Sequence, residues 1–447
     1  MRKKKIPAAG EKETPMHLLA RIYLGMLAVV LILWCGTESY GAISRAKHGC
    51  VMLLSGGYVL LTLILWAEWR LTGTARGALS LRKLGPVRGL IVLYLLLTLA
   101  ATILSPYEES WRGMSRGEGF RTLLLYGLSF LLLTVWGQFR PWMIHALGGA
   151  MSINCLVAVL QLLGYNPLEL YPAGLTYYDA GKAYSGEYLG LTGNADVTSA
   201  LLALVIPLFA GYLWKGGGKK RFWLSLPLAL SVTVLLWSEV AAGYAALLVG
   251  LAVTVPVLLP ERRQRIAGWC AVGAAAAAAA VTLWLWEPAG GTLRELHLLL
   301  HGEISGSFGS GRLHIWKQVL ELAGDNLLFG TGPDTLAAAE LEGFSRYDAS
   351  LEMLLVAQID LAHNEYLNIL VSQGLPALLA YLGALGITLA RWWKYGRSSP
   401  VSAVCGAAIL WYSIQVFFSF SLCATAPLFW AVWALAEREY SIGRDRT

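Results

Sequence analysis

Residues 87–104 read VRGLIVLYLLLTLAATIL, a run in which Arg88 is the only charged side chain. About 20 apolar residues are enough to cross the hydrocarbon core of a bilayer as a helix, so this stretch predicts a transmembrane span. The rest of the chain has the same character: 56% of its 447 residues are hydrophobic and 14% are charged, against roughly 25% charged in a soluble protein. The chain is therefore expected to lie in a membrane.

Twelve runs of this kind predict an all-α polytopic membrane protein with about twelve transmembrane helices. The last run is short, so a count of eleven stays open. Seven consecutive alanines, Ala274–Ala280, predict that one span packs closely on a neighbour. The predicted spans are 18–36, 50–69, 87–104, 120–137, 142–163, 196–214, 222–238, 240–260, 266–286, 368–391, 401–421 and 425–436.

Basic residues are divided unevenly between the two sets of loops. With residue 1 in the cytoplasm, 25 of the 35 Lys and Arg fall on the cytoplasmic side and 10 on the other, which is the positive-inside pattern. This predicts a multi-pass protein of the cytoplasmic membrane with both termini in the cytoplasm. The net charge of +7 then reflects topology and contact with anionic membrane lipids, and no nucleic-acid partner is needed to explain it.

Two extracytoplasmic segments, 164–195 and 287–365, are too long to be simple connections. The second is a long helical loop, with helix-like stretches at Leu313–Ala323 and Leu351–Leu370 on either side of the turn Gly330–Pro333. The predicted organisation is a basic cytoplasmic N-terminus (1–17), a membrane domain of nine spans (18–286), a large extracytoplasmic catalytic loop (287–365), three further spans (366–436) and a cytoplasmic tail (437–447).

The stretch Asp360-Leu-Ala-His363-Asn364-Glu-Tyr366 stands directly before the tenth predicted span. A histidine at the membrane–water boundary can take up or hold a proton near neutral pH. Asp360 lies three residues earlier, one helical turn away, and could orient the ring or raise its pKa. A polar interfacial turn that ends a helix would account for the same residues.

Arg312 follows a run rich in Gly and Ser and opens a predicted helix. The free N–H groups and dipole of a helix N-terminus favour anions, and a guanidinium there could hold a phosphate oxygen. Trp316, four residues later, shares its face and could pack on lipid or sugar. The alternative is a solvated first-turn arginine with Ser310 as the helix cap.

Arg112, Arg116 and Arg121 place three cations within ten residues on the side that should be poor in them. They could hold phosphate or pair with neighbouring glutamates such as Glu118. Charges are nearly absent from the spans themselves, which disfavours a transporter or flippase of lipid-linked glycan, kept as the alternative together with a membrane scaffold. No DxD and no GxxxxGK[ST] motif occurs, so no metal site or phosphate-binding loop is predicted.

Several short motifs resemble those of the O-antigen ligase-related family, which includes O-antigen ligases and some bacterial polysaccharide polymerases. The likeness is strongest over roughly residues 186–390. It rests on Gly190–Asp196 before the sixth span, Arg312-(x3)-Trp316, the Gly330–Pro333 turn, and His363-Asn364-x-Tyr366 followed by Gly374-Leu375-Pro376.

The resemblance implies a metal-independent glycosyltransferase with a GT-C-like helical fold and no cofactor. The donor would be a glycan on undecaprenyl diphosphate and the acceptor a hydroxyl of a glycan or lipid, on the outer face of the cytoplasmic membrane, during assembly of a cell-envelope polysaccharide. His363 matches the family's essential histidine, the base toward the acceptor, and Arg312 matches an arginine that binds the diphosphate. The expected supporting residues are Asp360, Asn364, Tyr366 and Trp316.

The chain departs from the family pattern at one position. Many members carry a serine–arginine pair at the start of the span that corresponds to 240–260, and here the arginine position is Ala242. We therefore expect Arg116 or Arg121 to supply the second cation for the diphosphate. A divergent subgroup with a different donor is the other interpretation.

Overall fold

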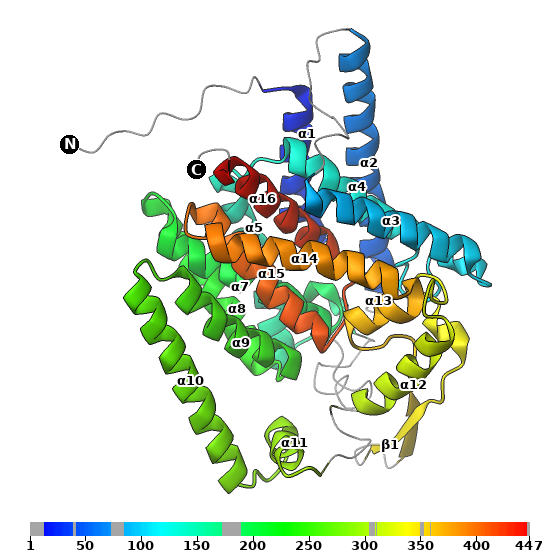
Figure 1. The fold of residues 1–447 in the computed structure, drawn as a ribbon, viewed down its shortest axis with the longest axis vertical. Helices are drawn as coiled ribbons and strands as arrows, with labels where there is room; N and C mark the ends of the chain where they lie inside the picture. Colours follow the sequence, from blue (N-terminus) through cyan, green and yellow to red (C-terminus); the bar gives the residue numbers. More distant parts are fainter. Residues whose placement is uncertain are drawn as a thin grey trace.

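The computed structural model describes residues 13–38, 42–72, 85–171, 189–303, 309, 311–348, 353–357 and 359–444. It is a helical bundle with one short β-hairpin (Figure 1). Within these ranges nine helices are long and apolar enough to cross a membrane, and two shorter apolar helices, Pro15–Leu31 and Phe120–Trp136, join them. The predicted class, a polytopic α-helical membrane protein, is confirmed.

Each of the twelve predicted spans overlaps at least one helix, and the tenth overlaps two α-helices. The label η marks a short π-helix (η1) or 3₁₀-helix (the others). The first part of the chain forms α1 (Pro15–Met26) continued by η1 (Leu27–Leu31), α2 (Ile43–Leu71), α3 (Pro86–Leu104), η4 (Glu108–Trp111), α4 (Phe120–Trp136), α5 (Pro141–Leu162), η5 (Pro167–Glu169), η6 (Gly190–Thr192), α7 (Ala195–Lys215), η7 (Lys219–Leu224), α8 (Ser225–Trp237), α9 (Ala241–Leu258) and α10 (Arg262–Leu285). The remainder forms α11 (Gly291–Leu300), α12 (Arg312–Asp325), η8 (Leu336–Ala339), β1 (Phe344–Asp348), β2 (Met353–Ala357), α13 (Glu365–Gln373), α14 (Leu375–Tyr395), α15 (Pro400–Phe417) and α16 (Ala426–Arg444).

The buried centre of the bundle is formed by α7 and α15, which pack on each other. Side-chain oxygens start both helices, because Asn194 Oδ1 accepts from the N–H of Val197 and Ser399 Oγ accepts from that of Ser402. Helix α16 is longer than the predicted 425–436. Its Trp433 is fully buried and donates from Nε1 to Thr388 Oγ1 of α14 at 2.7 Å.

Helix α10 stands at the side of the bundle (Figure 1). It meets its neighbours only near its ends, where Gly268 lies against Pro256 of α9 and the carbonyl of Leu283 contacts His297 of α11. Ala274–Ala280 are all exposed. The predicted close packing of these alanines is wrong within this chain, because no other helix covers the middle of α10.

The helix-like stretch predicted for Leu351–Leu370 is wrong over its first half. Met353–Ala357 is strand β2, which pairs antiparallel with β1, and α13 begins only at Glu365. A short apolar run fits a strand or a helix equally well by periodicity alone, and its partner strand decides between them.

The tenth span begins later than predicted, at Leu375 instead of residue 368. Gly374 ends α13 with a φ of +87°, a conformation that favours glycine, and Pro376 lies in the first turn of α14, where no N–H is needed. A Cβ at Gly374 would collide with the carbonyl of Leu328. The chain is therefore broken into two helices at this point.

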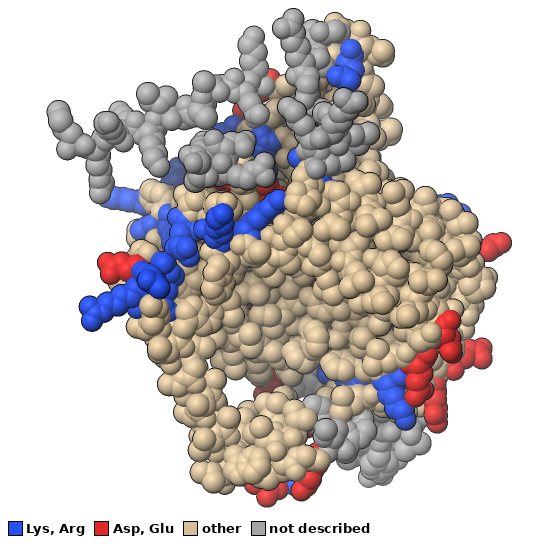
Figure 2. Space-filling model, viewed as in Figure 1, with Lys and Arg blue, Asp and Glu red and all other residues tan. Residues whose placement is uncertain are grey.

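The two ends of the bundle differ in charge. The start of α1 and the end of α16 lie at one end, and α11, α12 and β1 lie at the other (Figure 1). Lys and Arg side chains gather near the first end, and acidic side chains gather at the second (Figure 2).

Replacing Gly374 with alanine is expected to destabilise the protein by about 1–3 kcal/mol, since the alanine must adopt the same positive φ and its Cβ meets the Leu328 carbonyl. Thermal unfolding in detergent measures the effect. Gly386→Ala is the matched control, because a Cβ at this position of α14 meets no atom within 4 Å. Equal unfolding midpoints for the two variants would contradict the assignment of Gly374 as the break.

Candidate active site

His363 lies in a turn that is fixed on both sides by hydrogen bonds. The Ala362 N–H donates to Asn368 Oδ1 at 3.2 Å, and the Ala362 carbonyl accepts from Trp316 Nε1 at 2.9 Å. On the other side, Asn364 Oδ1 accepts from the N–H groups of Tyr366 and Leu367 and starts α13. His363 itself has a φ of +47°, so its backbone is held in a conformation that few L-residues adopt.

The imidazole of His363 is surrounded by charges from four separate segments. Burial lowers the pKa of His363 below its ordinary value, Asp196 and Asp360 act to raise it, and Arg312 and Arg116 act to lower it. The ring meets Phe420 edge-on with centroids 5.4 Å apart, and its Nδ1 is buried with no hydrogen-bond partner among the described residues. A largely neutral imidazole near pH 7 can accept a proton.

Arg116 forms an ion pair with Asp360, one of the charged residues around His363. Its Nε and Nη2 donate to Asp360 Oδ2 at 3.1 and 2.9 Å, and both side chains are about one third exposed. The alternative that Arg116 pairs with a neighbouring glutamate is wrong, because Glu118 instead accepts from the Tyr126 hydroxyl. Asp360 is also not one helical turn from His363, since the residues between them are not helical.

The loop that carries Arg116 is held by Asp334, which follows the Gly330–Pro333 turn. Asp334 Oδ2 accepts from the N–H groups of Arg116 and Glu118, and its Oδ1 accepts from Ser115 Oγ. Burial raises the pKa of Asp334, and these hydrogen bonds act in the opposite direction. This aspartate ties the loop before α4 to the segment between α12 and α13.

Arg312 is the first residue of α12, as predicted, but the helix cap is Gly311, with a φ of +84°. Ser310 lies outside the described residues. The Arg312 Nη1 donates to the Gly309 carbonyl at 2.9 Å, while its Nε is buried without a partner in the described part of the chain. Helix α12 is anchored by Ile315 and Val319, which pack in one apolar cluster with Ala362.

Three predicted site residues have other surroundings than expected. Trp316 and Tyr366 donate hydrogen bonds to backbone carbonyls, and Arg121 is exposed. Trp316 donates to the His363 turn and packs edge-on against Phe417, and the Tyr366 hydroxyl donates to the Ser413 carbonyl of α15 at 2.9 Å. Arg121 is exposed on the first turn of α4 and makes no ion pair with a described residue.

The Gly190–Asp196 segment reaches the site from the start of α7. Gln161 Oε1 accepts from the Gly190 N–H and Asn154 Oδ1 from the Leu191 N–H, so the polar side chains within α5 hold this segment. Asn194 then caps α7, and Asp196 follows it. A cavity of about 100 Å³ lies here, lined in part by Arg116, Asn194 and Val197.

The sequence did not predict that three acidic side chains meet in a buried cluster next to the His363 turn. Glu118, Asp334 and Glu365 line one small cavity of about 40 Å³, and burial raises the pKa of Glu118 well above its ordinary value. Burial also raises the pKa of Glu365 to about 7, although its Oε2 accepts from the Ser421 N–H. In the sequence Glu118 stands out only as a possible partner of the nearby arginines, and Glu365 only as the neighbour of Asn364.

No group of three or more His, Cys, Asp or Glu side chains within the described ranges has an arrangement that could hold a metal ion. Ala242, at the position of the family arginine, is buried at the start of α9. The charged residues that act on His363 are two arginines, Arg312 and Arg116, and two aspartates, Asp196 and Asp360.

Glu365→Gln is expected to make the protein less sensitive to pH. A carboxyl with an ordinary pKa of 4.5 when unfolded and about 7 when folded lowers stability progressively as pH rises from about 4.5 to 7. Glutamine keeps an acceptor for the Ser421 N–H without the charge. Thermal unfolding of both proteins between pH 4.5 and 8 should show equal stability at the acidic end and a more stable variant, by on the order of 3 kcal/mol, above pH 7. A constant difference at every pH would contradict the assignment.

The bundle and the polar group at the end of its helices define a polytopic α-helical membrane protein with a site at one end of its spans. Residues 226–382, about one third of the chain, match the family model described as O-Antigen ligase. This match supports the resemblance to the O-antigen ligase-related family seen in the motifs, over the matched segment. The matched segment contains Arg312 and His363 but not Arg116. No curated protein matches the chain.

Proposed function

We propose that the protein transfers a glycan from undecaprenyl diphosphate to an acceptor hydroxyl on the outer face of the cytoplasmic membrane. The observation that carries this proposal is the grouping of His363 with two arginines, Arg312 and Arg116, whose charges both act on its imidazole. A base can take the proton of the acceptor hydroxyl, and cations can stabilise the leaving diphosphate. The same arrangement serves a ligase or a polymerase, since these differ in the acceptor.

In the proposed reaction the acceptor oxygen attacks the anomeric carbon of the donor, and His363 takes the hydroxyl proton. The bond from that carbon to the diphosphate oxygen breaks, and the diphosphate leaves with the electron pair. Arg312 stabilises the growing negative charge, and its buried Nε offers an N–H without a protein partner in the described region. A positioned base contributes roughly 10²- to 10⁴-fold.

Arg116 is the second cation in this proposal, in place of the arginine that the family carries at Ala242. Its Nε and Nη2 are taken by Asp360, which leaves Nη1 to donate to a diphosphate oxygen. Asp360 and Asn364 act as supporting residues, because they position Arg116 and the His363 turn.

The proposed topology has both termini in the cytoplasm and His363 at the outer face. Basic side chains near the start of α1 and the end of α16 (Figure 2) support it, since cytoplasmic loops of membrane proteins are rich in Lys and Arg.

His363→Ala and Arg312→Ala are expected to lower transfer from undecaprenyl-diphosphate glycan by at least 100-fold, because the base or the leaving-group cation is lost. Transfer by the purified protein to an added glycan or lipid acceptor is measured as loss of donor and gain of product. Translocation of the donor without transfer in both wild type and variants would favour the flippase alternative.

Arg116→Gln and Arg121→Gln are matched variants, because each removes one arginine from the same short stretch of the chain. Loss of Arg116 is expected to reduce transfer by about 10- to 100-fold, while loss of the exposed Arg121 should have little effect. Full activity of the Arg116 variant, with activity abolished by Arg312→Ala, would remove Arg116 from the mechanism.

Asp196→Asn is expected to shift the acidic limb of the pH profile to lower pH. The Asp196 carboxylate raises the pKa of His363, so its removal lets the imidazole lose its proton at a lower pH, whereas Arg116→Gln should shift the limb to higher pH. The limb is read from kcat/KM between pH 5 and 8. Shifts in the same direction for both variants would contradict His363 as the titrating base.

A further inference from the structure

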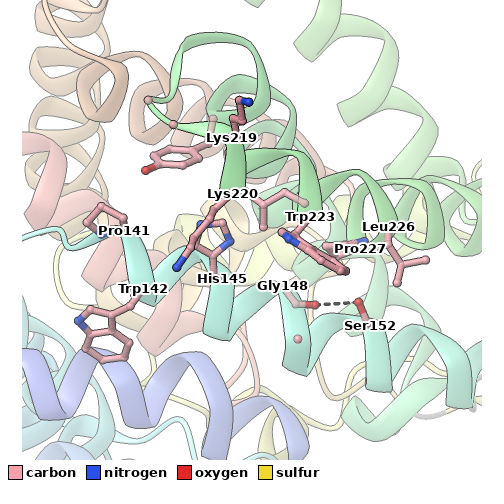
Figure 3. Close-up of a pocket in the computed structure, with 15 residues that line it drawn as sticks. Pro141, Trp142, His145, Gly148, Ser152, Lys219, Lys220, Trp223, Leu226 and Pro227 are labelled. Atoms are coloured by element: carbon pink, nitrogen blue, oxygen red, sulfur yellow. Dashed lines mark hydrogen bonds between the residues drawn. The ribbon is translucent and has the colours of Figure 1, made fainter.

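A large cavity lies at the opposite end of α7 from Asp196 and the His363 site. It has a volume of about 850 Å³ and lies between α5, the loop after α7 and the start of α8 (Figure 3). Tyr212, which lines it, is sixteen residues after Asp196 on the same helix, or about 24 Å along the axis. The cavity is therefore separate from the candidate active site.

The walls of this cavity are largely apolar, and there is free space beside Gly149. Gly149 of α5 lines it, and a Cβ added there would meet no atom within 4 Å. Trp142, Trp223 and Leu226 border the cavity and expose 49%, 78% and 59% of their surfaces. Large aromatic side chains exposed at the end of membrane helices prefer the level of the lipid headgroups.

The mouth of the cavity is basic. Lys219 and Lys220 line it, both are exposed, and neither forms an ion pair with a described residue, while no acidic residue lies among the lining side chains. Figure 3 shows Lys220 extending toward Trp142 and His145. The nearby Arg221 is held instead by the carbonyls of Trp214 and Gly216.

We propose that this cavity binds one anionic phospholipid from the membrane leaflet on that side. The headgroup phosphate lies beside Lys220 at the mouth of the cavity, with Lys219 adding positive charge nearby, and an acyl chain follows the apolar lining past Gly149. Basic pockets between helices on the cytoplasmic side of membrane proteins are suited to such headgroups. The apolar walls distinguish a lipid from a soluble phosphate, which would leave Trp223 and Leu226 in contact with water.

The experiment is native mass spectrometry of the full-length protein, released from nanodiscs that contain equal amounts of phosphatidylglycerol and phosphatidylcholine with identical acyl chains. The wild type is expected to retain one phosphatidylglycerol in preference to phosphatidylcholine. The double variant Lys219→Gln/Lys220→Gln should reduce that preference by roughly 25-fold, about 5-fold for each lysine. Gly149→Leu should reduce retention of both lipids, because the leucine fills the groove.

The matched control is Arg262→Gln/Arg263→Gln, which removes two exposed cations from the start of α10, outside the cavity. Gly149→Leu favours helix formation and meets no neighbour within 4 Å at its Cβ, so thermal unfolding should show a folded protein. Unchanged lipid retention in Gly149→Leu, or an equal loss of preference in the control, would overturn the proposal. Equal competition by glycerol phosphate, which lacks acyl chains, would assign the lysines to a soluble anion instead and would also overturn it.

Discussion

Every backbone polar group in the hydrocarbon core of a membrane must find its partner within the protein, and this constraint organises the whole structure. Helices satisfy it along their length, but the segments that approach the site are turns or short 3₁₀ turns. Polar side chains hold these segments. Asn154 and Gln161 of α5 accept from the backbone of Gly190 and Leu191, and Asn368 accepts from Ala362.

The position of His363 is a consequence of these contacts. Trp316 from α12 donates to the residue before it, and Asn364 caps the helix after it, so two elements distant in the chain fix one turn. Asp334 ties the Arg116 loop to the same region through two backbone N–H groups. Trp316, Asn364 and Asp334 therefore determine where His363 and Arg116 lie.

Positively charged side chains at the two ends of the bundle have different surroundings. Near His363, Arg116 lies beside a carboxylate, that of Asp360. At the other end, Lys219 and Lys220 stand without such partners in the described region beside apolar walls. The first arrangement suits a diphosphate that must bind and leave, and the second suits a lipid that stays.

Much of the fold could be predicted from the sequence because membrane helices have a strong local signal. The runs 87–104 and 142–163 correspond to α3 and α5 within one residue at each end, and the run 401–421 corresponds to α15 within one residue at its start. The errors lie where the local signal is weak. Met353–Ala357 needed a partner strand to become β2, and the break at Gly374 depended on the close approach of Leu328.

The sequence by itself determined the membrane class, the helical runs, and His363 and Arg312 as candidate residues, since composition and motifs are written in consecutive positions. Only the tertiary structure decided which charges meet. It pairs Arg116 with Asp360, 244 residues away, adds Asp196 to the group and leaves Arg121 exposed. The physical reason is that electrostatic contact depends on distance in space, and in a bundle this is set by the packing of helices far apart in the chain.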